Sequence, residues 1–248
     1  MELLTDRVAV VTGGGRGMGK LEAELFAEQG ASVILTDVDE ENGQAVADAI
    51  TKTGGDARFV AADVSEEADW ESLLAMIDET YGRLDILVNN AGILRNQTVT
   101  EETVEGWERV LGVDLRGVWL GMKHAIPAMI DSGGGSVVNI SSIWGLRGGD
   151  GVSASYHAAK GGVTVLTKNA AVAYGSDGVR VNSIHPGYIR QDVDEGEEPD
   201  HGPPTEEIPQ GRFATGDEIA DTALFLASDM ASYVNGEDIA VDGGWLAK

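Results

Sequence analysis

A short apolar run leads into a glycine-rich turn near the start of the sequence, which reads VAVVTGGGRGMG at residues 8–19. The run predicts a buried strand, and the residues after Gly17 have the apolar spacing of a helix. A helix amino terminus reached through such a turn presents free N–H groups and the positive end of the helix dipole. The segment therefore predicts a pyrophosphate site, with an ordinary tight turn as the alternative.

The spacing of the glycines distinguishes two kinds of phosphate-binding turn. Met18 stands where the pattern G-x-G-x-x-G would need its third glycine, so that pattern is not met. Gly13, Gly17 and Gly19 instead follow the spacing G-x-x-x-G-x-G. We expect this turn, including Arg16 and Met18, to contact the phosphates.

An acidic residue, Asp37, ends the second predicted strand, eighteen residues after Gly19. A carboxylate at this place accepts hydrogen bonds from the adenosine ribose and repels a 2′-phosphate. No Lys or Arg lies between Asp37 and Lys52, and Arg16 is the only base nearby in the turn. The sequence therefore favours NAD over NADP as cofactor. A turn residue without a ligand is the alternative for Asp37.

Strand-like runs alternate with helical segments along the whole sequence. The runs are 8–12, 32–37, 58–62, 85–89, 136–141, 180–185 and 238–241, and the helical segments are 17–29, 40–53, 66–81, 107–131 and 155–175. Parallel strands need crossover connections, and strands buried on both faces are continuously apolar. We therefore predict an α/β fold, a single doubly wound (Rossmann) domain over residues 1–248 with a seven-stranded parallel sheet and helices on both faces.

A proline-rich acidic stretch follows the sixth predicted strand. Four of the six prolines fall within eleven residues, at Pro199, Pro203, Pro204 and Pro209. The residues after it are too few for a second domain, so we interpret residues 188–211 as a lid over the carboxyl edge of the sheet.

The charge of the chain excludes several classes of partner. Seventeen Lys and Arg stand against 42 Asp and Glu, giving a net charge of −25. This charge repels nucleic acids and anionic membranes. Only six of the bases are lysine and the acids are spread along the chain, a composition that resembles halophilic proteins from salt-accumulating cells, with an acidic mesophilic enzyme as the alternative.

Other classes of site and location are excluded by what the composition lacks. There is no cysteine, which rules out disulfides and thiolate metal sites, and the four histidines have no paired ligand spacing, so no metal is expected and they are interpreted as surface or packing residues. No apolar run is long enough to span a membrane, and the first residues lack the features of a secretory signal. We expect a cytoplasmic protein.

Five motifs together resemble the short-chain dehydrogenase/reductase family. They are Thr12-Gly13 with Gly17 and Gly19, Asn89-Asn90-Ala91-Gly92, Ser142, Tyr156 with Lys160, and Pro186-Gly187. The resemblance covers essentially the whole chain and is closest to NAD-dependent secondary-alcohol and hydroxysteroid dehydrogenases, through residues 181–189. It implies hydride transfer between a nicotinamide and a secondary alcohol or ketone.

Tyr156 and Lys160 are one helical turn apart, so they share a face of the predicted helix. Lowering a phenol pKa from about 10 to near neutrality requires about 4 kcal/mol. One charge at about 4 Å with an effective dielectric constant of about 20 supplies about 4 kcal/mol. We therefore expect Lys160 to lower the pKa of Tyr156, which would act as general base in oxidation and general acid in reduction. A surface helix pair is the alternative.

The resemblance assigns further residues. Ser142, rather than Ser141, would hold the substrate oxygen, and Asp114 stands where the family has an asparagine in its proton relay. Cofactor contacts are implied for Asp63, Val64, Asn90, Gly92, Tyr156, Lys160, Pro186, Gly187 and Ile189. Gln191 stands where a threonine commonly binds the carboxamide, and a homotetramer is implied through the helices that carry Asp114 and Tyr156.

Two other functions remain open. A 3-oxoacyl-carrier-protein reductase is opposed by Asp37 and by the acidic lid, which would repel an acidic carrier protein unless high salt screens it. An NAD-sensing protein without turnover is opposed by the intact Tyr156 and Lys160. We expect a small alcohol or ketone as substrate.

Overall fold

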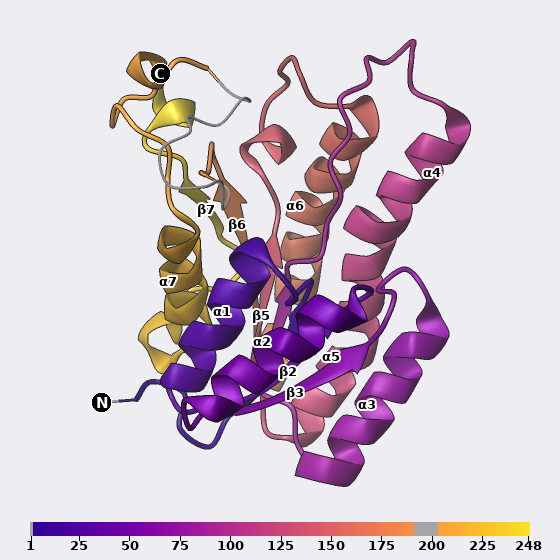
Figure 1. Ribbon diagram of the computed structural model, residues 1–248, viewed down its shortest axis with the longest axis vertical. Helices are drawn as coiled ribbons and strands as arrows, with labels where there is room; N and C mark the ends of the chain where they lie inside the picture. Colours follow the sequence, from indigo (N-terminus) through magenta and orange to yellow (C-terminus); the bar gives the residue numbers. More distant parts are fainter. Residues whose placement is uncertain (1, 191–202) are drawn as a thin grey trace.

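The computed structural model describes residues 2–190 and 203–248, in which a seven-stranded sheet forms the centre of the molecule (Figure 1). All strands pair in parallel in the order β3-β2-β1-β4-β5-β6-β7. Their bounds are β1 Val8–Thr12, β2 Ser32–Asp37, β3 Asp56–Ala61, β4 Ile86–Asn89, β5 Gly135–Ile140, β6 Val179–Pro186 and β7 Asp238–Val241. The predicted fold class is confirmed. Strand order reverses between β1 and β4, which places a ligand crevice at their carboxyl ends.

Helices cover both faces of the sheet (Figure 1). They are α1 Gly17–Glu28, α2 Glu40–Lys52, α3 Glu67–Tyr81, α4 Val104–Leu111, α5 Val118–Asp131, α6 Ala154–Tyr174 and α7 Gly216–Ala227. One apolar core joins α1, α2 and α7 to the sheet, through side chains such as Phe26 and Val46. A second core joins α3, α5 and α6 to the opposite face, through side chains such as Leu73 and Val163. Within the described residues, no helix is both long and apolar enough to cross a membrane.

The segment predicted as one helix over 107–131 is divided. It begins as α4 at Val104, continues through a π-helical turn at Gly112–Gly117 and ends as α5. A Cβ on Gly117 would come within 2.9 Å of Val64 Cγ2, so glycine permits a close approach there. Asp114 lies in the π-helical turn, a feature often found at functional sites.

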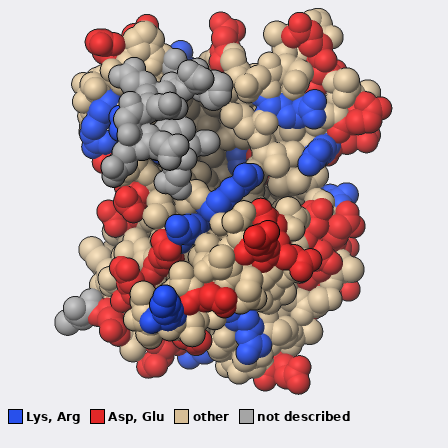
Figure 2. Space-filling view, viewed as in Figure 1, with Lys and Arg blue, Asp and Glu red and all other residues tan. Residues whose placement is uncertain are grey.

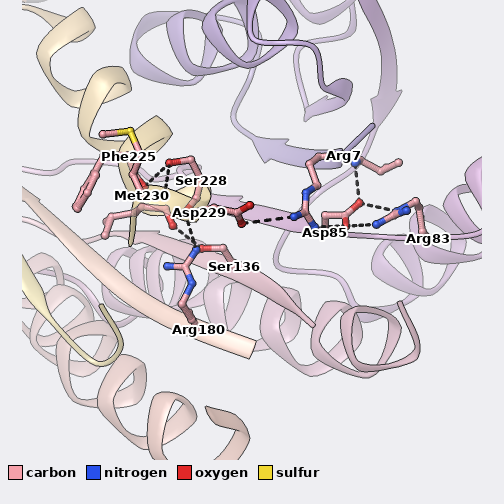
Figure 3. Close-up of polar contacts among 11 residues, drawn as sticks. Arg7, Arg83, Asp85, Ser136, Arg180, Phe225, Ser228, Asp229 and Met230 are labelled. Carbon is pink, nitrogen blue, oxygen red and sulfur yellow. Dashed lines mark hydrogen bonds and ion pairs between the residues drawn. The ribbon is translucent and has the colours of Figure 1, made fainter. Parts of the chain in front are cut away.

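A polar cluster ties the elements together at the amino edge of the sheet (Figure 3). The buried Asp85 carboxylate accepts hydrogen bonds from the Val8 N–H at 2.9 Å, from Arg7 Nη1 at 3.1 Å and from Arg83 Nε at 2.9 Å. Arg7 also lies 3.5 Å from Asp229, which follows α7. These contacts hold the amino ends of β1 and β4, while the opposite edge remains available for a site.

Candidate active site

The glycine-rich turn opens the amino end of α1 toward the carboxyl edge of the sheet. Gly13 and Gly17 have positive φ, +66° and +54°, and a Cβ on Gly19 would collide with the Gly13 carbonyl oxygen. Arg16, the residue before α1, gives no side-chain hydrogen bond to the first N–H groups of the helix. Asn90 Nδ2 donates to the Thr12 carbonyl oxygen at 2.9 Å and so fixes the turn against the end of β4. A phosphate fits this arrangement because the backbone is accessible and the helix dipole is uncapped.

A cleft of about 1210 Å³ runs from this turn along the carboxyl edge of the sheet. It is lined by most of the predicted cofactor residues: Gly13, Arg16, Gly17, Met18, Asp37, Asp63, Val64, Asn90, Gly92 and Ile189. Three arginines that the sequence reasoning missed, Arg109, Arg116 and Arg190, line it as well. The cleft is also lined by acidic side chains, among them Glu105 and Glu108, and no motif in the sequence marks the three arginines.

Asp37 is held at the end of β2 by the backbone. Its carboxylate accepts hydrogen bonds from the Gly15 N–H at 3.0 Å and the Asp39 N–H at 3.1 Å, one to each oxygen. Each oxygen keeps a lone pair for a ribose hydroxyl. The exposed Asp39 has its pKa lowered chiefly by hydrogen bonds from Asn42, and the Arg16 charge contributes to the same shift. The positive charge of Arg16, the only base in the turn, is therefore partly balanced by the carboxylate of Asp39.

Lys160 is buried and lies between a carbonyl and a carboxylate. Its Nζ donates to the Ile140 carbonyl oxygen at 3.0 Å and lies 3.3 Å from Asp114 Oδ2. Asp114 is fully buried, and its other oxygen accepts the Ile93 N–H at 2.9 Å. A Cβ on Gly92 would come within 3.0 Å of Asp114 Oδ2, so this glycine leaves room for the pair.

Burial and the contact between Lys160 and Asp114 shift the pKa of both side chains. Burial alone would lower the pKa of Lys160, but the Asp114 charge raises it overall, which keeps the ammonium charged. Burial raises the pKa of Asp114, against the effects of Lys160 and the Ile93 N–H.

The pKa of Tyr156 is not lowered toward neutrality, as the sequence predicted it would be. Burial, the largest effect, raises the pKa, and so does the Asp114 charge, while Lys160 and a hydrogen bond with Ser142 lower it. The net shift is upward. The expectation is wrong for the polypeptide by itself because it left out desolvation and the carboxylate beside Lys160.

The structure distinguishes the two serines at the end of β5. The Ser142 side chain faces the Tyr156 phenol, and its Oγ accepts the Trp144 N–H at 3.2 Å. Ser141 Oγ donates to the Lys160 carbonyl oxygen at 3.0 Å and is occupied in packing α6 onto β5. The geometry therefore favours Ser142, as the sequence register does.

Several predicted residues lie away from the cleft. Pro186 ends β6, and the Gly187 N–H donates to the Val241 carbonyl oxygen at 3.0 Å, so this motif contacts β7. Gln191 lies outside the described residues. No group of three or more His, Asp or Glu that could hold a metal ion occurs in residues 2–190 and 203–248.

Comparison with known proteins decides the family. A family profile described as enoyl-(acyl carrier protein) reductase matches residues 13–246. The chain is 41% identical over 243 residues to a 2,5-dichloro-2,5-cyclohexadiene-1,4-diol dehydrogenase of Sphingobium indicum, covering 98% of this chain and 97% of that protein. The chain belongs to the short-chain dehydrogenase/reductase family. This short-chain dehydrogenase/reductase is an oxidoreductase that acts on CH–OH groups with a nicotinamide cofactor.

Two further relatives cover the chain almost completely. The cyclohexanol dehydrogenase of Acinetobacter sp. strain SE19 is 42% identical over 245 residues, covering 98% of this short-chain dehydrogenase/reductase and 96% of that protein. The structure of a putative NAD(P)-dependent gluconate 5-dehydrogenase of Beutenbergia cavernae, with NADP bound at low occupancy, has a TM-score of 0.90 and 37% identity, covering 99% of this chain and 98% of that one.

Proposed function

We propose that this chain oxidises cyclic secondary alcohols to ketones with NAD, and catalyses the reverse reduction. The observation that carries the proposal is the meeting of Ser142, Tyr156 and Lys160 at the carboxyl edge of the sheet. The Tyr156 oxygen takes the hydroxyl proton of the alcohol while Ser142 holds the substrate oxygen. NAD held along the cleft by the glycine-rich turn and Asp37 would supply the acceptor for the hydride of the carbinol carbon, so that the C–O single bond would become a carbonyl.

Lys160 and Asp114 control the proton on Tyr156 in this proposal. Lys160 favours the phenolate, whereas Asp114 opposes it and also keeps Lys160 charged. An oxidised nicotinamide would supply further positive charge that acts in the same direction as Lys160. The phenol would then lose its proton more readily in the complex than in the polypeptide by itself.

The cofactor preference rests on Asp37. Its carboxylate is fixed by two backbone N–H groups and lines the cleft, where it can bind ribose hydroxyls and repel a 2′-phosphate. A structural relative, a putative NAD(P)-dependent gluconate 5-dehydrogenase, has NADP bound at low occupancy, so the fold by itself does not decide between the two cofactors and the proposal relies on Asp37.

An aromatic cluster beside Ser142 supports a ring-shaped apolar substrate. The ring of Tyr188 lies 6.2 Å from Trp144, 6.0 Å from Phe213 and 5.1 Å from Trp245, measured between ring centroids. Trp144 follows Ser142 by two residues, so this apolar wall reaches the reacting group. Two of the relatives act, by their names, on six-membered ring alcohols. Tyr188 is the first residue of the proposed lid over residues 188–211, of which 191–202 lie outside the described residues.

Assembly and salt adaptation complete the proposal. Large apolar side chains are exposed on three neighbouring helices: Trp107 on α4, Trp119 on α5, and Val165 and Val172 on α6. Their burial between subunits favours a homotetramer. Acidic side chains spread over the described surface of the face in Figure 2 favour a salt-adapted enzyme, and we retain the cytoplasm as its proposed location.

The experiment is a substrate and cofactor panel followed at the NADH absorbance. Cyclohexanol, cyclopentanol, cyclic diols, linear secondary alcohols and a 3-oxoacyl thioester are compared with both cofactors. We expect cyclic alcohols to be oxidised, with kcat/KM at least about tenfold higher for NAD than for NADP, which corresponds to about 1.4 kcal/mol. The variant Asp37→Ser should narrow this ratio. Equal efficiency with both cofactors contradicts the assignment of NAD.

The same panel separates the two alternatives. Activity with the 3-oxoacyl thioester alone would favour the 3-oxoacyl-carrier-protein reductase. Binding of NADH without turnover of any alcohol or ketone would favour the NAD-sensing protein.

A further inference from the structure

His185 is a fully buried histidine on β6 with both ring nitrogens engaged. Its Nδ1 lies 2.8 Å from the Ser142 carbonyl oxygen. Its Nε2 lies 3.0 Å from Ser183 Oγ and 3.5 Å from Asp238 Oδ1. The ring therefore connects the end of β5, where the proposed substrate-binding serine lies, to a carboxylate on β7.

The partners of His185 decide where its proton lies on the side of Ser142. A carbonyl oxygen can only accept, so Nδ1 carries a hydrogen and donates it to Ser142. On the other side, Nε2 contacts the oxygen of Ser183, whose hydroxyl hydrogen is donated to Asp238. The hydrogen bond from Nδ1 to Ser142 is independent of this contact.

Asp238 fixes the outer end of this network. It accepts Ser183 Oγ at 2.6 Å and pairs with Lys168 Nζ of α6 at 2.5 Å. Burial acts to raise the pKa of Asp238, but hydrogen bonds from Lys168 and Ser183, together with the nearby His185, lower it overall. Asp238 therefore stays ionised and anchors the imidazole.

The network has a direct consequence for the Ser142 peptide. Its carbonyl oxygen accepts from His185 and also from the Gly145 N–H at 2.9 Å, so two donors fix the orientation of the carbonyl. Fixing this peptide restrains the backbone that carries the Ser142 side chain, whose hydrogen bond contributes to the pKa of Tyr156. We propose that His185, anchored by Asp238, is a positioning residue that holds Ser142 at the correct place for the substrate oxygen. The inference rests on the role of Ser142 in the proposed function.

The first test compares two replacements of His185. His185→Asn keeps a donor near the position of Nδ1, whereas His185→Leu removes both polar contacts. We expect His185→Leu to lower kcat for cyclohexanol by about tenfold or more, because a small misplacement of a reacting group is costly. His185→Asn should stay within about threefold of the parent, and the Kd for NADH should be unchanged in both. Equal losses in both variants would contradict a role through the Nδ1 hydrogen bond.

The second test is a double-mutant cycle with Ser142→Ala. If His185 acts through Ser142, adding His185→Leu or Asp238→Asn to Ser142→Ala costs no further activity. Asp85→Asn, at the opposite edge of the sheet, is the control for destabilisation alone. Its effect on activity should be the same in the parent and in Ser142→Ala. Should His185→Leu fold poorly, Asp238→Asn carries the same cycle.

The outcomes separate this inference from the proposed function. A harmful Ser142→Ala combined with an additive loss from His185→Leu and from Asp238→Asn overturns the positioning role alone. A Ser142→Ala enzyme with full activity removes Ser142 from the proposed function, and the inference falls with it.

Discussion

At the scale of single residues, Glu22 shows how burial changes a carboxyl group. It lies on α1 with no exposure, and neither carboxylate oxygen has a hydrogen-bond partner among the described residues. Desolvation raises its pKa from 4.5 to about 8. The folded protein therefore keeps this carboxyl protonated at pH values where the unfolded chain releases the proton.

The variant Glu22→Gln tests this state through the pH dependence of stability. Between pH 4.5 and about 8 the folded state binds one proton more than the unfolded state at this position, so stability falls by about 1.4 kcal/mol per pH unit. Glutamine has a similar shape and does not titrate. We expect the difference in Tm between the variant and the parent to grow from pH 5 to pH 8. The control is Glu28→Gln on the exposed side of the same helix. A difference in Tm that is constant with pH would contradict the buried neutral acid.

The residue scale also shows where chemistry in the site could not be predicted. The spacing of Tyr156 and Lys160 on one helix identified both side chains, because four residues make one turn. The pKa of Tyr156 depends on Asp114, which lies on a different helical segment and reaches Lys160 only in the folded chain. The contacts of His185 come likewise from residues distant in the sequence, Ser142 at 43 positions and Asp238 at 53 positions. The sequence therefore predicted His185 only as a surface or packing residue.

At the scale of elements, the Asp85 cluster is the main polar tie at the amino edge (Figure 3). Asp85→Asn removes the charge that pairs with Arg7 and Arg83. We expect unfolding in urea to show a loss of about 2 kcal/mol, less than for a fully buried pair because both arginines are about 40% exposed. Activity per folded molecule should be unchanged. Asp177→Asn, in an exposed turn, is the matched control. A loss no larger than that of the control would contradict the role of the cluster.

The elements themselves differ in how far the sequence predicted them. All seven strands appear within two residues of the expected bounds at each end. The five inner strands are mostly buried and form apolar runs, whereas the edge strands β3 and β7 are partly exposed. The π-helical turn at Gly112–Gly117 was not predicted, since one extra residue in a turn barely alters the apolar spacing. Helix α7 was also not expected, although Thr215 and Glu218 form a capping box at its start.

At the scale of the whole molecule, the charge of −25 on 248 residues is the dominant feature. Acidic side chains are distributed over the described part of the face in Figure 2, and the sequence has only six lysines. Like charges on a folded surface repel one another, and this repulsion falls as salt shortens the Debye length.

The salt dependence of Tm and activity follows from this surface. We expect both to rise between about 0.1 M and 2 M potassium chloride, as the Debye length falls from about 10 Å to below 3 Å. Sucrose at matched osmolality is the control for effects of solute exclusion. An acidic mesophilic enzyme would instead be stable in dilute buffer and lose activity as salt rises. No upward shift of Tm would contradict salt adaptation.

The most direct test of the account is the turnover of Tyr156→Phe. Phenylalanine keeps the ring but lacks the transferable proton, so kcat for cyclic alcohols should fall by about a hundredfold or more. The fluorescence of bound NADH should show an almost unchanged Kd, and Tyr174→Phe, near the end of the same helix, should keep full activity. A Tyr156→Phe enzyme that retains a tenth of the parent kcat would contradict the acid and base role on which the proposed function depends.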